Sequence, residues 1–508
     1  MAAKAKPRVG IVGAGIAGLR CADILIQNGA RVTILEARGR IGGRVHQSEI
    51  AGHLVDLGPN WIHGTEENPI MDIADATKTI ARDPEGRNIS ISCDGQLVDE
   101  QLTTKAAEFI WTTIEKAFEY SNHHGDSIPV ERSLFDFIQE HVQKTNFSDK
   151  EKKLCLDSCK LWGAYVGDPI ERQSLKFFRL EECIDGNNYF VASTYKRILE
   201  HVAKTALAQA DIRFKQHVIK IEAPQIDGKH QVKVTTASGD IHDFDELVVT
   251  CPLGWLKRNT EAFHPRLPDR LLEAIKSISY GRLEKVYITF PEAFWNTDSN
   301  DTAHNKQPSA NPVFAQFLEP TYTSHPKDIQ WNQECLSLAS LPTPCAHPTL
   351  LFYTYGPCAT NIVEQIADLV EGSEKYNQVL TTILEPFYSK LPGYNPTSTS
   401  CKPTSILATR WQKDPYAGNG SYCNFQVDLT TGDKDIEALR SGVGLGPERG
   451  IWFAGEHTAP FVALGTTTGA YWSGERAAVQ VCGKVGLGRI GVGVARDDSL
   501  PSASAGGK

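Results

Sequence analysis

The sequence contains no apolar run that approaches the roughly 18 residues needed to cross a membrane. It also has no excess of basic residues, because 52 Lys and Arg stand against 61 Asp and Glu, giving a formal net charge of -9. A nucleic-acid-binding surface needs clustered Lys and Arg, whereas an acidic balance is compatible with attracting a cationic small molecule. We therefore expect neither a membrane span nor a nucleic-acid partner.

Cysteine pairs at metal-binding spacing are missing as well. The 12 Cys are scattered without a CxxC pair, and the closest spacing, Cys155 to Cys159, fits no familiar zinc site. Residues 1–7 lack the apolar stretch of a secretory signal, and the chain ends in Gly-Gly-Lys instead of the peroxisomal Ser-Lys-Leu. We expect mostly buried thiols, no metal site and a cytoplasmic protein.

The first 40 residues predict a strand, a tight glycine turn, a helix and a second strand. The β-branched run around Val9 to Val12 is typical of a buried parallel strand, and apolar residues then recur at helical spacing until Asn28. Residues 32–35 form the second strand. A right-handed crossover is the common way to join two such strands through a helix, so this end of the chain is α/β.

Along the remaining chain, helical and strand patterns alternate several times, which predicts interleaved domains. Helical patterns occupy residues 100–124 and 131–144, strand patterns return between 195 and 255, and the last strand, loop and helix end near 485. We predict an α/β fold: a Rossmann-type domain (residues 1–80, 195–270 and 440–485), an α+β substrate domain (81–194 and 271–439) and a disordered tail (486–508). A polar loop at 296–311 is expected to be flexible.

A dinucleotide fingerprint follows the first strand. In the run from Gly13 to Gly18, Gly13 permits the turn, Gly15 leaves room for a pyrophosphate at the helix N-terminus, and Gly18 lets helix and strand pack closely. Glu36 ends the second strand and is placed to accept hydrogen bonds from a ribose. The motif alone does not choose between NAD and FAD.

The residues after Glu36 make that choice. Arg38 to Arg44 read R-G-R-I-G-G-R, and this run after a Rossmann fingerprint resembles the flavin amine oxidase superfamily. Further blocks match in order: residues 57–64, 250–257, Lys285 with Phe294-Trp295, and 453–458. The resemblance implies FAD, held by Gly13, Gly15, Ala17, Gly18, Glu36, Arg38, Gly43, Arg44, Gly58, Asn60, Trp61, Val218, Glu456 and Thr467.

Within the superfamily the sequence resembles the polyamine oxidases of animals and fungi. The resemblance makes His63 a partner of the substrate ammonium, and Lys285 the lysine that contacts flavin N5 through water. Trp411 and Tyr422 are candidates for an aromatic wall opposite the flavin. Carboxylates for a polycation are expected in the insert, with Glu182 as first candidate beside Glu181, Asp185 and Asp168.

The resemblance implies hydride transfer from the carbon next to a neutral secondary amine to FAD. Hydrolysis of the imine then gives an aldehyde and a shorter amine, and oxygen is reduced to hydrogen peroxide. Monoamine oxidases attach their flavin to a Cys, and here Ser421 stands at that position, so the FAD should be non-covalent; Cys423 is the one neighbour that could change this. Thr468 replaces a His common in relatives, which puts the preferred substrate end in doubt.

Four alternatives stay open. They are a monoamine oxidase, a lysine-demethylase-like enzyme, an L-amino-acid oxidase that clamps a carboxylate with Arg410, and a flavoprotein that only binds. A demethylase would carry a coiled-coil insertion and an N-terminal helical module, whereas this chain starts at the Rossmann strand. The sequence does not specify the polyamine, the bond that is oxidised or the oligomeric state.

Overall fold

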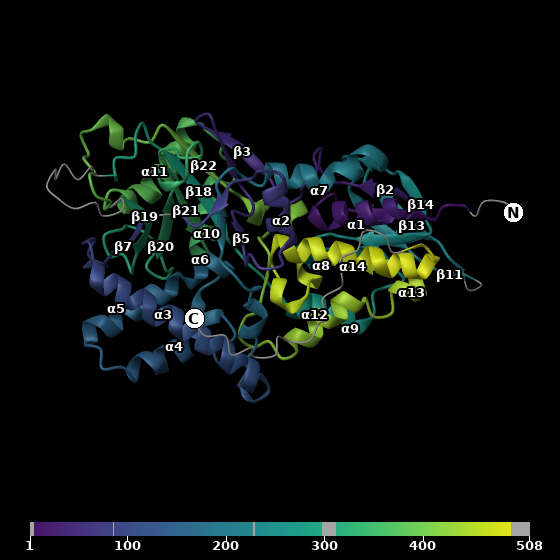
Figure 1. Ribbon diagram of the computed structural model, residues 1–508, viewed down its shortest axis with the longest axis horizontal. Helices are drawn as coiled ribbons and strands as arrows, with labels where there is room; N and C mark the ends of the chain where they lie inside the picture. The colour runs from purple at the N-terminus through teal and green to yellow at the C-terminus, as the bar shows by residue number, and fades with distance from the viewer. Residues whose placement is uncertain (1–4, 85, 227–228, 297–310, 489–508) are drawn as a thin grey trace.

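The first sheet consists of five short parallel strands in the order β24-β15-β1-β2-β9. The computed structural model describes residues 5–84, 86–226, 229–296 and 311–488, and Figure 1 shows this sheet in the lobe that also holds the N-terminus. Its strands are β1 (Arg8–Val12), β2 (Arg31–Leu35), β9 (Asp211–Arg213), β15 (Glu246–Val249) and β24 (Ile451–Phe453). The two strands predicted before Glu36 are thereby confirmed.

Helices and a second layer of strands enclose this sheet. Helix α1 (Ile16–Gln27) packs against α7 (Lys196–Gln209) and α14 (Thr467–Val485). The close approach of α14 requires Gly474, because a Cβ there would lie 2.3 Å from the carbonyl oxygen of Ala17. The second layer is a four-stranded sheet of β10 (Val218–Glu222), β13 (Val232–Thr236), β14 (Ile241–Phe244) and β16 (Phe263–His264).

The other lobe is built on a six-stranded mixed sheet in the order β22-β18-β21-β20-β19-β7. Its strands are β7 (Arg87–Ile91), β18 (Glu284–Thr289), β19 (Pro312–Phe317), β20 (Gln333–Ser337), β21 (Thr349–Thr354) and β22 (Ser405–Ala408). All pairs are antiparallel except β19 with β7. Helices α10 (Gly356–Ile366) and α11 (Glu374–Tyr388) bury one face, and a second apolar cluster with Ile50, Val55 and Phe190 buries residues of the other. Strands β18, β20 and β21 are therefore buried along their whole length.

Three helices in blue lie beneath this sheet in Figure 1: α3 (Glu100–His124), α4 (Leu134–Gln143) and α5 (Asp149–Cys159). Their starts follow from local sequence, because Asp99 accepts hydrogen bonds from the first turn of α3. Ser133 and Ser148 form capping boxes at α4 and α5. The two helical segments predicted from sequence are confirmed, and α3 has the predicted bounds.

Shorter elements connect these layers. The helices are α2 (Pro69–Ala76), α6 (Gly163–Val166), α8 (Leu253–Arg258), α9 (Asp269–Ser277), α12 (Gly432–Ser441) and α13 (Gly446–Arg449). The strands are β3 (Gln47–Ile50), β4 (His53–Asp56), β5 (Trp61–Ile62), β6 (Ala81–Arg82), β8 (Tyr189–Val191), β11 (Gln225–Ile226), β12 (Lys229–His230), β17 (Ser279–Tyr280) and β23 (Cys423–Asn424).

The α/β fold class is confirmed, and the domain boundaries stay predictions. All 12 cysteines are free thiols and nine are buried. Among the described residues no helix is long and apolar enough to cross a membrane, and no cluster of His, Cys, Asp and Glu could hold a metal. Most of the expected flexible loop (residues 297–310) and most of the tail (489–508) lie outside the described residues.

Candidate active site

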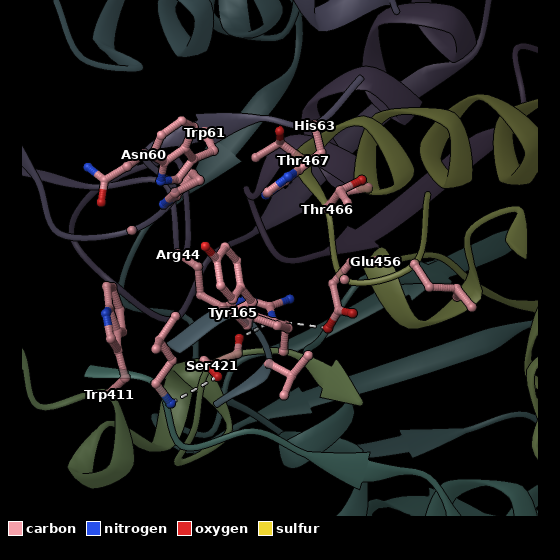
Figure 2. A pocket seen from close by; sticks show the side chains of 18 of the residues that line it. Arg44, Asn60, Trp61, His63, Tyr165, Trp411, Ser421, Glu456, Thr466 and Thr467 are labelled. Carbon is pink, nitrogen blue, oxygen red and sulfur yellow. Dashed lines mark hydrogen bonds and ion pairs between the residues drawn. The ribbon is translucent and has the colours of Figure 1, made fainter. Parts of the chain in front are cut away.

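A cavity of about 870 Å³ is lined by residues of both lobes, and it contains nearly all the residues that the sequence singled out. Of the predicted cofactor residues only Gly18 lies outside the lining. Lys285, His63, Trp411 and Tyr422 line it as well, whereas Glu182 does not. Figure 2 shows Asn60, Trp61, His63, Arg44 and Trp411 around one space. The fold therefore brings together residues that are far apart in the sequence.

The N-terminus of α1 opens on this cavity. Gly13 takes a φ of +106°, which side chains rarely adopt, and a Cβ at Gly18 would lie 2.1 Å from the carbonyl oxygen of Gly13. At Gly15 the added Cβ would meet no atom within 4 Å. The turn therefore packs closely against Gly18, whereas the space next to Gly15 contains no protein atom. Free N–H groups at a helix N-terminus, facing open space, suit a pyrophosphate.

A second helix N-terminus faces the same cavity. Thr466 caps α14, accepting a hydrogen bond from the Gly469 N–H at 2.9 Å, and Thr466 and Thr467 both line the cavity. The Thr467 hydroxyl lies 3.3 Å from the hydroxyl of buried Tyr195. Two helix dipoles thus direct their positive ends at one space, which favours an anionic ligand.

The residues predicted to contact ribose and adenine lie on one side of that cradle. Glu36 is buried and accepts hydrogen bonds from the backbone N–H groups of Ala14 and Arg38, both at 2.8 Å. Val218 is buried at the start of β10 and lines the cavity. Arg38 forms an ion pair with Asp414 at 2.7 Å, which holds its guanidinium at the cavity wall.

Partly buried Arg44 and buried Glu456 form an ion pair at 3.0 Å, and Figure 2 shows their side chains pointing toward each other. Burial would raise the pKa of Glu456, but Arg44 and its neighbours hold that pKa below its ordinary value. Arg44 also donates to the carbonyl oxygen of Ser421 at 2.6 Å. This network joins the loop after β2, the loop before β23 and the loop after β24 into one wall.

These features fit FAD. The cavity offers two helix N-termini, an open glycine turn and the cations Arg38 and Arg44, which match a long ligand with a pyrophosphate at its centre. When bound, FAD would be held by the α1 turn and Glu36 at its adenosine end and by the Arg44 wall and α14 at its flavin end.

Lys285 reaches this cavity from β18, although it is only 5% exposed. Its Nζ donates to the carbonyl oxygen of Gly58 and lies 3.5 Å from that of Asp56. It also lies 5.8 Å from the ring centroid of Tyr353. Burial lowers the pKa of Lys285, with Asp56 opposing the shift. A neutral amine at this point can accept a proton or orient a water molecule.

Aromatic rings form much of the remaining wall. Trp411 is oriented by a hydrogen bond from its Nε1 to the carbonyl oxygen of Leu57 at 3.1 Å. The hydroxyl of Tyr422 donates to the carbonyl oxygen of Tyr165, and both tyrosines line the cavity. Trp61 donates to the hydroxyl of Tyr353 at 3.1 Å. Rings held in this way can enclose aliphatic stems and attract cations.

His63 lines the cavity next to these rings. Burial lowers the pKa of its imidazole, and a hydrogen bond with Asn188 opposes the shift. The ring is therefore neutral at physiological pH, which leaves it able to accept a proton. Figure 2 places His63 beside Thr467, near the N-terminus of α14.

The expected carboxylates are distributed differently from the prediction. Glu182 accepts a hydrogen bond from Asn122 at 3.3 Å and lies outside the cavity lining, because the chain turns its neighbour Glu181 inward. Asp168 is buried in an ion pair with Arg282, and Asp185 is exposed. Of the four carboxylates named from sequence, only Glu181 faces the cavity.

Sequence reasoning missed Glu334. It lies in β20, is 4% exposed and lines the cavity. The short strand QECLS has no alternating apolar pattern, so the sequence around Glu334 offered no signal for it. Burial raises the pKa of both Glu334 and Glu181 to about 7.

Three further residues lie away from the cavity. Arg410 donates to the carbonyl oxygens of Ala367 and Leu369, so its guanidinium points away from the ligand space. Thr468 is buried and donates to Asn68 at 2.9 Å, outside the lining. The threonine side chain itself therefore forms no part of the cavity wall. Cys423 is buried behind the lining, whereas Ser421 is part of it.

Comparisons with known proteins identify the family of this chain. The family model for flavin containing amine oxidoreductases matches residues 16–482. Polyamine oxidase 4 of Oryza sativa subsp. japonica is 27% identical over 93% of this chain and 88% of its own length. The peroxisomal N(1)-acetyl-spermine/spermidine oxidase of Homo sapiens is 27% identical, over 93% and 94%. Lysine-specific histone demethylase 1 homolog 3 of Oryza sativa subsp. indica is 26% identical, over 93% of this chain but 53% of its own length. Since the family model spans most of the chain, the predicted resemblance is confirmed: the protein belongs to the flavin-containing amine oxidoreductases, and its cofactor is FAD.

Proposed function

We propose that this oxidoreductase oxidises a secondary amine of a polyamine, such as spermine, spermidine or an acetylated form. One observation carries the proposal: the cavity that holds Lys285 also contains Glu181 and Glu334, two carboxylates without a Lys or Arg partner among the described residues. A carboxylate in an apolar chamber needs a cation, and a polyamine supplies more than one.

The chemistry follows from how the side chains are arranged. FAD, when bound, accepts the hydride from the carbon next to the amine nitrogen, and oxygen then takes the electrons to give hydrogen peroxide. Trp411 and Tyr422 would hold the alkyl chain, and neutral His63 would accept a hydrogen bond or proton from the substrate nitrogen. Lys285 would orient the water that hydrolyses the imine to an aldehyde and a shorter amine.

We further propose that the FAD is non-covalent. The hydroxyl of Ser421 accepts a hydrogen bond from the N–H of Leu283 at 3.3 Å and lines the cavity, where a monoamine oxidase would present a thiol. Cys423 lies outside the lining, and burial raises the pKa of its thiol well above the ordinary value. A buried, protonated thiol is a poor nucleophile.

An amino-acid substrate is disfavoured, because a carboxylate clamp needs a cation at the cavity and Arg410 points elsewhere. Demethylase-like and monoamine oxidase activities would use the same catalytic residues as a polyamine oxidase. Only the substrate that is oxidised distinguishes the three activities. Glu181 and Glu334 favour a substrate with several charges over a monoamine.

The test is hydrogen peroxide release by purified holoenzyme given spermine, N1-acetylspermine, spermidine, benzylamine, L-amino acids and a dimethyl-lysine peptide in parallel. We expect turnover of a polyamine and a fall of roughly 100-fold in Lys285→Met, the scale of a lost proton-transfer or water-positioning group. Lys413→Met, which removes an exposed lysine, is the matched control. Turnover of benzylamine, an amino acid or the peptide alone would refute the polyamine assignment, and no turnover would favour a binding protein.

A further inference from the structure

Four cavity-lining side chains share one row across the large sheet. Lys285 of β18 pairs with Tyr353 of β21, Tyr353 pairs with Glu334 of β20, and Glu334 pairs with Gln316 of β19. All four line the same cavity. Residues in register on neighbouring strands present their side chains to the same face, so the row forms one continuous strip of the cavity wall.

Within this row Glu334 is the one carboxylate. Its Oε2 accepts a hydrogen bond from the side-chain amide of Gln316 at 2.9 Å. No Lys, Arg or His of the described residues lies within ion-pair distance of it. Since Glu334 is 4% exposed, the cost of removing its charge from water is offset by a single neutral donor. Such a group is poised to accept a cation from a ligand.

The strand register also sets the distance between Lys285, where the amine is oxidised in the proposed function, and Glu334. Adjacent strands lie about 4.8 Å apart, so two steps along the row separate Lys285 from Glu334 by about 10 Å. Tyr353 lies between them, with its hydroxyl donating to Asn60 at 3.2 Å. A ligand bound along this strip would pass from Lys285 over the Tyr353 ring to the Glu334 carboxylate.

We propose that Glu334 binds a second ammonium group of the substrate, several methylene groups from the nitrogen that is oxidised. This assignment rests on the proposed function and makes it more specific. Glu334 would act as a specificity-determining residue that selects diamines and polyamines over monoamines. Tyr353 would support the connecting alkyl chain.

Glu181 is less suited to this role. Its Oε1 accepts from the backbone N–H of Phe425 at 3.3 Å and from Gln173 at 3.5 Å, so the protein supplies it with one donor more than Glu334 has. It also lies in the short helical turn Phe178–Glu181, outside the sheet, and therefore has no fixed register with Lys285.

The experiment measures binding of α,ω-diaminooctane and of aminooctane to the FAD-loaded enzyme through the change in flavin absorbance. We expect the wild type to prefer the diamine, and Glu334→Gln to weaken diamine binding by roughly 10- to 100-fold while leaving aminooctane unchanged, as for a lost charged hydrogen bond. Gln keeps the volume of the side chain. Glu292→Gln, which removes an exposed carboxylate of the same lobe, controls for overall charge.

Spermine oxidation distinguishes this proposal from the one on which it rests. If the wild type oxidises no polyamine, the proposed function fails. If it oxidises spermine and Glu334→Gln keeps the wild-type ratio of diamine to monoamine affinity, only the role of Glu334 is refuted. If Glu334→Gln does not bind FAD, the same measurement is made on Glu334→Asp. A ratio of diamine to monoamine affinity reduced about 10-fold supports binding of the second ammonium by Glu334, and an unchanged ratio refutes it.

Discussion

At the scale of single residues, two buried carboxylates of the large sheet differ in the hydrogen bonds that the fold gives them. Glu334 and Glu284 are both nearly fully buried, and burial raises the pKa of each to about 7. Their environments differ, however. Glu284 accepts hydrogen bonds from the hydroxyl of Thr409 at 2.5 Å and from the backbone N–H groups of Trp411 and Gln412, whereas Glu334 has one amide donor.

This contrast predicts opposite effects of the same substitution. Between the unfolded pKa near 4.5 and the folded pKa near 7, the folded state holds a proton on Glu334 that the unfolded state lacks, so stability falls as pH rises through this window. In substrate-free enzyme, Glu334→Gln should therefore raise the melting temperature at pH 8, where the charge is buried, and have little effect at about pH 4.5 or below.

At pH 8 Glu284→Gln should instead lower the melting temperature, because the amide replaces one of the two acceptor oxygens that hold the loop carrying Trp411. Thermal unfolding of both variants and the wild type at the two pH values checks this pair. A Glu334→Gln variant destabilised at pH 8 as much as Glu284→Gln would mean that Glu334 is a structural acceptor.

At the scale of elements, two glycines at the turn into α1 are expected to affect different properties. Gly15 should matter for FAD binding and Gly18 for the stability of the fold. Gly15 has an ordinary φ of −78° and open space above it, whereas Gly18 contacts the turn itself. Gly15→Ala should leave the stability of the apoprotein within about 0.5 kcal/mol of wild type, since its Cβ meets no protein atom. It should nevertheless weaken FAD binding, because the methyl group enters the pyrophosphate space.

Gly18→Ala should instead destabilise the apoprotein itself, since its Cβ would lie 2.1 Å from the Gly13 oxygen. FAD titration and unfolding of the two apoproteins test the pair. Equal FAD affinity in Gly15→Ala and wild type would show that the pyrophosphate does not lie over Gly15.

Element prediction succeeded where local sequence is sufficient. The amphipathic helix α3 and the strands β1 and β2 carry their own caps, turns and apolar patterns, and these form with little help from the rest of the chain. Strand β20 was not predicted, because QECLS has no alternating pattern. Its strand character depends on pairing with β19 and β21, which come from distant segments.

At the scale of the whole molecule, the cavity lies where two lobes meet, and FAD would contact residues from 13 to 467. Removing FAD should therefore lower the melting temperature of the entire chain in one transition. Adding FAD at 100 times its dissociation constant should restore about 2.7 kcal/mol, with a logarithmic dependence on concentration. Calorimetry with increasing FAD tests this. Two separate transitions, only one sensitive to FAD, would contradict a cofactor that joins both lobes.

The sequence by itself determined the α/β class and the glycine turn, because each depends on contiguous residues whose spacing specifies the structure. It singled out Lys285 only through the resemblance to the family. Tertiary structure alone decided which carboxylates face the cavity, since one residue of offset turned Glu181 inward and Glu182 away. It likewise directed Arg410 and Thr468 elsewhere and brought Glu334 into one row with Lys285. Strand register and loop direction arise from long-range packing, and a single sequence does not encode these locally.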